Sequence, residues 1–184
     1  MRKFCLTIIV LAGFSKALFA QFGNCTASEM QTYTDRETGN TITILTDTLK
    51  NDRFLYQTDP MWTHDGKYLL FRSSSRANDK KIERTLPNGE KRSWTPTQIY
   101  FIEMATGQII QATEGPDLGS AFLANKSNRM FISRKEKEDW NMYVMDLDKF
   151  FADVKKGKVG KPTAYETLLG TFPTSMGRPG GYAI

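Results

Sequence analysis

The chain has 184 residues, of which 40% are hydrophobic and 24% are charged, and its formal net charge is +5. This length suits one good core or two small ones, and the proportions are neither those of a disordered chain nor those of a membrane-embedded one. The positive charge favours an anionic partner. The lysines and arginines are scattered and no nucleic-acid-binding motif accompanies them, so we expect no nucleic acid.

The first twenty residues have the pattern of a cleaved export signal. Arg2 and Lys3 precede a mostly apolar run over residues 4–14, and Ala20 provides a small residue just before Gln21. The run is too short to span a bilayer comfortably. We therefore predict a signal peptide at residues 1–20 and an exported protein, periplasmic or secreted, with no membrane span after the signal is removed.

The cysteines exclude a disulfide framework. The chain has two of them, and Cys5 would leave with the signal, so that Cys25 has no partner within the mature chain. Residues 22–24 lack the pattern of a lipid-attachment site, and we expect no lipid anchor. Residues 21–29 are short and polar and are predicted to be a leader before the folded region.

A hairpin is predicted at the start of the folded region. Residues 30–35 and 41–46 flank a turn at Gly39, and threonine alternates with isoleucine in the second of these segments. Because β-branched side chains at a period of two line one face of a strand, we expect this hairpin to bury one face.

Residues 59–113 predict a four-stranded meander. Met61 and Trp62 close a first strand, residues 63–66 supply a turn, and residues 68–71 form a short buried second strand. Two further strands, at 97–103 and 108–113, follow a polar insertion. They flank a Thr-Gly turn like the one at Gly39. Four strands in meander order are the repeating unit of a β-propeller.

A weaker copy of the same unit follows. Residues 121–124, 129–133 and 141–146 are predicted strands, and residues 149–161 are the one helix-compatible segment. Phe150, Phe151 and Val154 lie at helical spacing in that segment, and we interpret the two phenylalanines as packing residues.

The predicted fold is all-β and consists of antiparallel propeller blades, about two and a half of them, over residues 30–184. A closed propeller needs at least four blades, and open blades leave an unpaired edge. We therefore expect the front part of a longer protein, truncated at the C-terminus. Closure by association and a smaller sandwich are the alternatives.

Candidate binding residues lie in and beside the insertion, residues 74–96, which is either a small extra hairpin or a functional loop. The predicted saccharide-binding residues are Arg72, Arg76, Arg84 and Trp94. Guanidinium groups bind carboxylates in a bidentate manner and an indole can stack on a sugar ring, which suits an acidic oligosaccharide. The alternative interpretation is a merely solvated charged loop.

No catalytic residue and no metal ligand is predicted from this chain. His64 is the only histidine, and it lies in a turn where a structural role suffices. The serines at residues 73–75 have no partner histidine in a plausible geometry, and there is neither a nucleophile elbow nor a phosphate-binding loop. No pattern specifies an oligomeric state.

Several spaced motifs together resemble a known family. They are Asp35-x-x-Thr38-Gly39, Leu45-Thr46, Thr63-x-Asp65-Gly66-Lys67-x-Leu69-Leu70-Phe71-x-Ser73, and Ile99-Tyr100-x-Ile102-x-x-x-Thr106-Gly107-x-Ile109-x-Gln111-x-Thr113. This pattern resembles the amino-terminal part of the oligogalacturonate lyases, polysaccharide lyase family 22, over residue 30 to about residue 148. It is similar, less specifically, to TolB-like or WD40-like propeller repeats.

The lyase resemblance implies pectin degradation by β-elimination on acidic oligogalacturonate, with Mn²⁺ as cofactor and a histidine as base. In the family the base and the metal ligands lie in later blades, and His64 matches none of them. Two other functions stay open. One is a non-catalytic TolB-like propeller that binds a periplasmic protein or envelope component, and the other is the propeller cap of a prolyl-oligopeptidase-type hydrolase.

Overall fold

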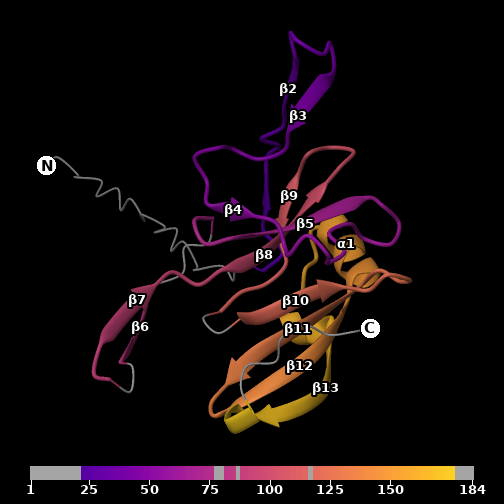
Figure 1. Cartoon of the computed structure of the whole chain (residues 1–184). Helices are drawn as coiled ribbons and strands as arrows, with labels where there is room; N and C mark the ends of the chain where they lie inside the picture. The colour runs from indigo at the N-terminus through magenta and orange to yellow at the C-terminus, as the bar shows by residue number, and fades with distance from the viewer. Residues whose placement is uncertain (1–21, 77–80, 86–87, 116–117, 177–184) are drawn as a thin grey trace, which may run out of the picture.

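The computed structural model describes residues 22–76, 81–85, 88–115 and 118–176 (Figure 1). The predicted signal peptide and the last eight residues lie outside these ranges. Every strand pair is antiparallel within the described residues, and the strands form two larger sheets and two hairpins. One α-helix accompanies them. The predicted all-β class is confirmed.

The first larger sheet has five strands in the order β1-β9-β8-β5-β4. Three of them, β5, β8 and β9, are strands of the predicted meander. The edge strands are β4, beside β5, and β1 from the leader, beside β9. The central pair, β5 and β8, is in register from Tyr68 opposite Glu103 to Ser73 opposite Gln98. The strand bounds are β1 Cys25–Thr26, β4 Asp52–Arg53, β5 Tyr68–Ser73, β8 Gln98–Glu103 and β9 Ile109–Gln111.

The second larger sheet is a plain meander of four strands in sequence order. Its third and fourth strands are joined through a helix, α1, and a short 3-10 helix, η1. A second 3-10 helix, η2, follows the fourth strand. The bounds are β10 Leu118–Leu123, β11 Arg129–Glu136, β12 Asp139–Asp146, α1 Leu147–Lys155, η1 Pro162–Ala164, β13 Glu166–Pro173 and η2 Thr174–Met176.

Helix α1 overlaps the predicted helix-compatible segment, residues 149–161, but it begins two residues earlier, at Leu147, and ends at Lys155. The Asp146 side chain accepts a hydrogen bond from the Lys149 N–H, which caps the first turn. Phe150 and Phe151 are buried, which confirms their predicted packing role.

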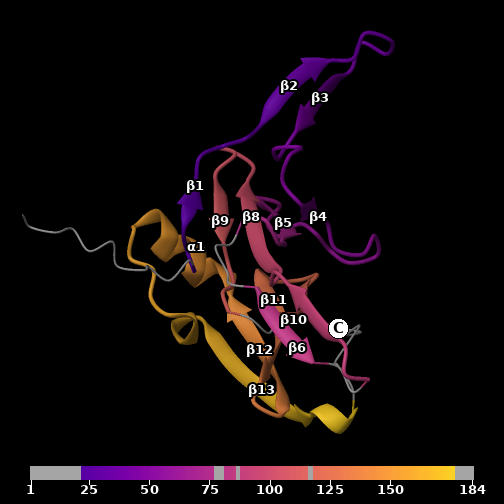
Figure 2. The same ribbon diagram turned by 90° about the vertical axis from the view of Figure 1, so that its left-hand side faces the viewer.

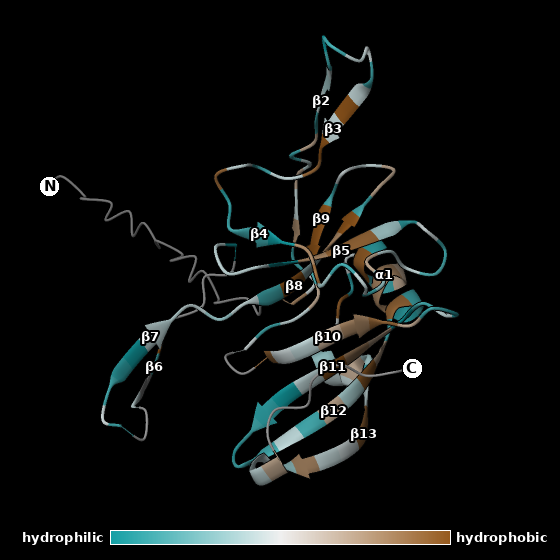
Figure 3. Ribbon diagram, viewed as in Figure 1, coloured by the Kyte–Doolittle hydropathy of each residue, from teal (hydrophilic) through white to brown (hydrophobic). Residues whose placement is uncertain are grey.

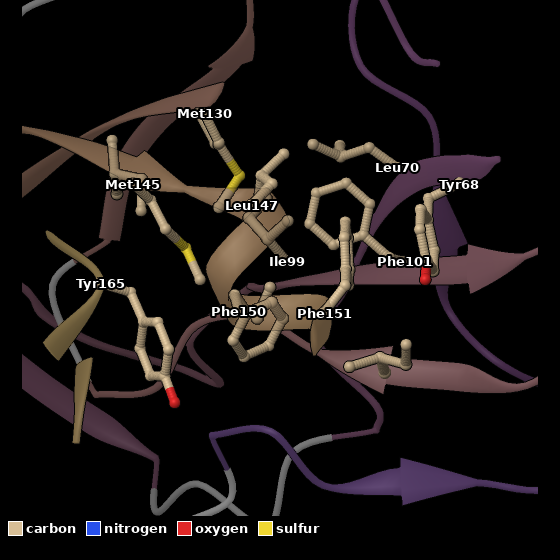
Figure 4. Close-up of a cluster of buried hydrophobic side chains, with 14 of the residues drawn as sticks. Tyr68, Leu70, Ile99, Phe101, Met130, Met145, Leu147, Phe150, Phe151 and Tyr165 are labelled. Atoms are coloured by element: carbon tan, nitrogen blue, oxygen red, sulfur yellow. The ribbon is translucent and has the colours of Figure 1, made fainter. Parts of the chain in front are cut away.

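The main core lies between the two larger sheets, with α1 across one end of it (Figure 4). The Phe151 ring stacks on Tyr68 of β5 with ring centroids 3.6 Å apart, and it meets Phe101 of β8 edge-on at 5.1 Å. From the other sheet, Met130 and Met145 are fully buried in the same cluster. The sheets are therefore held face to face like neighbouring propeller blades, with α1 as a wedge.

The first strand of the leading meander differs from its prediction. Trp62 makes only an isolated bridge to Leu69, and the ladder strand is instead β4, Asp52–Arg53, which lies further upstream. Pro60 has no N–H to donate to a ladder, so a regular strand is disfavoured in the residues just before Trp62. The intervening residues leave the sheet edge and line a cavity.

Two hairpins extend from the larger sheets (Figures 1 and 2). The insertion forms β6, Ile82–Thr85, and β7, Lys91–Trp94, so the predicted small extra hairpin is confirmed. Figure 3 shows hydrophilic residues along much of this hairpin. The other hairpin is β2, Gln31–Thr34, with β3, Thr41–Ile44.

The β2–β3 hairpin forms where it was predicted, but the expected buried face is wrong. Every residue of β2 and the first three of β3 are exposed, because no sheet covers the hairpin within the described part of the chain. Period-two alternation specifies a strand with two different faces, whereas burial of one face needs a neighbouring element.

Candidate functional site

A cavity of about 920 Å³ opens between the inner edges of the two larger sheets. It lies at the end of the sheets where β5 finishes, β10 begins and the insertion returns to the fold. This is the end opposite the turn that contains His64. Its lining consists of Asn51, Arg53, Leu55, Tyr56, Gln57, Asp59, Arg72, Ser74, Trp94, Thr95, Pro96, Thr97, Ile99, Leu118, Gly119, Ser120, Ala121 and Phe122.

Two arginines face each other across adjacent strands in this cavity. Arg53 of β4 is the direct register partner of Arg72 of β5, and both side chains are exposed. The Arg53 Nε donates to the Asn51 side-chain oxygen at 3.2 Å. Neither guanidinium forms an ion pair with a carboxylate of the described residues. Like charges directly opposite each other destabilise a strand pair, so the site favours an added anion.

An indole lines the same cavity as this arginine pair. Trp94 ends β7, lines the cavity and leaves 38% of its surface exposed. Thr95 and Thr97 follow it along the wall, and Asn51 lies near Arg53. An aromatic face, hydroxyl groups and an amide next to paired cations are the groups that recognise an acidic sugar.

Arg72 and Trp94, both predicted from sequence to bind saccharide, are thus brought together in one cavity. Arg84 lies in β6 opposite Arg92 of β7, within the insertion hairpin. Arg53 was missed. Its strand is two residues long and carries no alternating pattern, and only its pairing with β5 places it beside Arg72.

Arg76 has a different environment from the one its sequence position suggested. Its side chain is 7% exposed, and its guanidinium binds Asp52 with Nε–Oδ1 at 2.9 Å and Nη2–Oδ2 at 2.6 Å. It also binds Glu29 with Nη1–Oε1 at 2.9 Å and Nη2–Oε2 at 2.6 Å. The guanidinium lies over the Phe71 ring, 5.3 Å from its centroid. The prediction that Arg76 contacts saccharide stays a prediction.

The charges of this cluster stabilise one another. The hydrogen bond from Arg76 is the main cause of a lowered pKa at Glu29. Burial by itself would lower the pKa of Arg76, but the hydrogen bonds to Glu29 and Asp52 outweigh it and raise that pKa. Glu29 and Arg76 therefore stay charged at neutral pH.

His64 lies at the opposite end of the sheets, where a turn of one sheet meets a turn of the other. Its Nδ1 is 3.1 Å from the Asn125 carbonyl oxygen, and the Asp65 N–H donates to the Asn128 side chain at 3.2 Å. Burial alone would raise the pKa of Asp65, but hydrogen bonds from Lys67 and Thr63 hold it at about 2. These contacts support the structural interpretation of His64.

No group of three or more histidine, cysteine, aspartate or glutamate side chains suited to a metal ion occurs among the residues that the structure describes. Within the same residues, no helix is long and apolar enough to cross a membrane.

No protein-family model and no curated protein matches the chain. Solved structures of oligogalacturonate lyases are similar to it. One, in complex with manganese, has a TM-score of 0.50 and 22% identity over 71% of this chain and 30% of its own. Another, from Vibrio parahaemolyticus, has a TM-score of 0.49 and 23% identity over 70% of this chain and 29% of its own.

The chain thus spans about 30% of the length of the manganese-bound lyase. At this level of identity the likeness concerns the fold, which is that of an incomplete β-propeller of antiparallel meander blades. The resemblance to oligogalacturonate lyases that the sequence motifs indicated is confirmed at the level of the fold.

Proposed function

We propose that the cavity between the two larger sheets binds an acidic oligosaccharide, with oligogalacturonate as the first candidate. The observation that carries this proposal is the Arg53–Arg72 pair, whose two positive charges lie side by side without a carboxylate partner in the described chain, in a cavity that Trp94 also lines. A uronate carboxylate between the two guanidiniums would relieve their repulsion through charge-assisted hydrogen bonds. The fold likeness to oligogalacturonate lyases supports the choice of saccharide.

In a protein of the lyase's full length, we propose that this cavity forms part of the wall of a site for β-elimination. The resemblance implies Mn²⁺ and a histidine base, and the residues described here do not fit that ion. His64, the only histidine of the chain, lies at the far end of the sheets and contacts Asn125. We therefore assign substrate binding to this chain and derive no step through the metal. Export to the periplasm or beyond would bring the cavity to pectin fragments.

Binding is tested by titrating the protein with trigalacturonate and with its fully methyl-esterified form, which has the same length but no charge. We expect the acidic form to bind and the ester to bind far less. Arg53→Gln and Arg72→Gln should each lower affinity roughly tenfold to hundredfold, the size of a hydrogen bond to a charged group. The effect of each should shrink at high salt.

The matched control is Arg92→Gln, which removes the same charge from the insertion hairpin, where Arg92 is exposed and pairs with Glu90 at 3.1 Å. It should leave affinity almost unchanged. Equal binding of the acidic and esterified forms, or full affinity after both cavity substitutions, would contradict the proposal.

Activity is tested separately with the product of the complete reading frame that contains this chain. With Mn²⁺ and oligogalacturonate present, the unsaturated product of β-elimination should absorb in the ultraviolet, and a chelator should abolish its formation. Binding without that absorbance would favour the non-catalytic propeller module.

A further inference from the structure

The strand that carries Arg53 is held weakly by its backbone. β4 has two residues, lies at the edge of its sheet and has two register partners, Ser73 and Arg72. One of these pairs places two arginines opposite each other, which opposes the pairing. Short edge strands of this kind open readily unless side chains hold them.

Side-chain contacts around Arg76 keep β4 in its place at the sheet edge. Asp52 is the other residue of β4, its side chain is 9% exposed, and both of its oxygens bind the Arg76 guanidinium. The same guanidinium binds Glu29, whose Oε2 also accepts the Asp47 N–H at 2.8 Å. Arg76 therefore joins β4 to the segment before β2 and to the root of the insertion.

Because Asp52 and Arg53 are neighbours in one strand, fixing the position of Asp52 also fixes the position of Arg53 in the cavity. Successive side chains of a strand point to opposite faces of the sheet. Asp52 points to the face where Arg76 covers Phe71, and Arg53 points to the face that lines the cavity. Asn51 also connects this strand to the start of the insertion. Its backbone N–H donates to the Ser75 hydroxyl and its side-chain amide to the Ser74 hydroxyl, both at 2.8 Å. Its side-chain oxygen accepts a hydrogen bond from Arg53.

We infer that Arg76 is a positioning residue for the cavity, acting through Asp52 on the placement of Arg53 rather than by touching the saccharide. This inference rests on the proposed function for its binding consequence. It assigns to the buried Arg76 cluster the task of keeping Arg53 and Arg72 together despite their repulsion.

The test is a double-mutant cycle between Arg76→Lys and Arg53→Gln with trigalacturonate as the probe. Arg76→Lys keeps the charge and loses the planar fork that binds two carboxylates at once. Alone it should lower affinity roughly tenfold, as expected for residues that share one hydrogen-bonded network. In the Arg53→Gln background it should lower affinity no further. A direct saccharide contact by Arg76 would instead give additive losses and would overturn the inference.

Hydrogen exchange of the β4 amides, measured without saccharide, separates failure of this inference from failure of the proposed function. Arg76→Lys should speed exchange in β4 and leave exchange in β11 unchanged. Faster exchange in a protein that binds no saccharide would reject the proposed function and keep the positioning role. Unchanged exchange would reject the positioning role. Glu29→Gln, which leaves the Asp52 contact intact, gives a milder second variant if Arg76→Lys does not fold.

Discussion

Two hairpins of this chain have the same turn and different surroundings. In β2–β3, the Gly39 N–H donates to the Asp35 carbonyl at 2.9 Å, and in β8–β9 the Gly107 N–H donates to the Glu103 carbonyl at 2.7 Å. Both glycines have positive φ, at 71° and 73°, a conformation that glycine adopts without the strain of a Cβ. The local structure repeats with its residues.

The threonine before each glycine repeats as well. Thr38 donates to the Asp35 carboxylate at 2.5 Å, and Thr106 donates to the Glu103 carboxylate at 2.8 Å. Each threonine oxygen also accepts a backbone N–H two residues later. The two turns are therefore built by one pattern of side-chain bonds within five residues.

What differs is the neighbouring structure. Phe101 of β8 and Ile110 of β9 are 0% and 2% exposed, because the second larger sheet and α1 cover them. Tyr33 of β2 and Ile42 of β3 are 50% and 38% exposed. A turn sequence therefore specifies a hairpin, and only the elements packed against it decide how much that hairpin contributes to stability.

The largest expected difference between the hairpins is in the cost of removing an aromatic side chain. Phe101→Ala should lower the free energy of unfolding by about 3–5 kcal/mol, because it opens a cavity beside the stacked rings of Tyr68 and Phe151. The control, Tyr33→Ala on the exposed hairpin, should change it by about 0.5 kcal/mol or less. Urea unfolding measures both. Equal costs would mean that β2–β3 is covered in solution.

A smaller difference should appear at the two turn glycines. Gly39→Ala should cost about 1–2 kcal/mol from backbone strain alone, since nothing lies within 4 Å of the added Cβ. Gly107→Ala should cost about 1 kcal/mol more, because its Cβ would overlap the Ser28 side chain. The extra cost should disappear in Gly107→Ala with Ser28→Gly. If it persists in thermal unfolding of that double variant, the overlap is not its cause.

The smallest expected effect is on folding stability at acidic pH. A hydrogen bond from Lys155 is the main cause of a lowered pKa at Glu103, with Thr106 next. Since the folded pKa is below the usual 4.5, this contribution is complete above pH 4.5 and is lost as pH falls through the folded value. Lys155→Gln should lower the free energy of unfolding by about 0.5 kcal/mol at neutral pH. It should also make that free energy depend less on pH below pH 4.5.

Asp35 provides the comparison for this acid effect. Its pKa is lowered mainly by the Thr38 hydroxyl, and it forms no ion pair with a lysine or arginine among the residues that the structure describes. Lys155→Gln should leave the local acid response of the β2–β3 turn unchanged, which can be followed from the chemical shifts of residues 36–40. If Lys155→Gln changed the acid response of both turns alike, the titrations of Asp35 and Glu103 would not be local to their own turns.

Much of the fold could be predicted from short-range patterns. The Thr-Gly turns, the strands around Tyr68 and Phe101, and the packing role of Phe150 depend on neighbours along the chain or on simple alternation. The strand predicted at Met61 and Trp62 was wrong because the ladder forms at β4 instead, where two residues carry no detectable period. Short irregular edge strands are set by their partner strand rather than by their own residues.

The candidate site was predictable only in part, for a related reason. Arg72 and Trp94 were identified because they lie beside and within a charged insertion, and the structure places both of them in the wall of the cavity. Arg53 was not, since its partnership with Arg72 joins residues 19 positions apart through a register that no local pattern specifies. Arg76 belongs to the same stretch of sequence as Arg72, yet it faces the other side of the sheet toward Asp52 and Glu29.

By itself, the sequence determined the turns, the cap of α1 and the alternation within the strands, because each depends on hydrogen bonds or spacings within a few residues. Only the tertiary structure decided which hairpin is buried, which arginine is tied into an ion cluster and which pair lines a cavity. Those outcomes depend on contacts between residues 19 or more positions apart, such as Arg53 with Arg72 and Arg76 with Glu29. No local pattern encodes contacts at that separation.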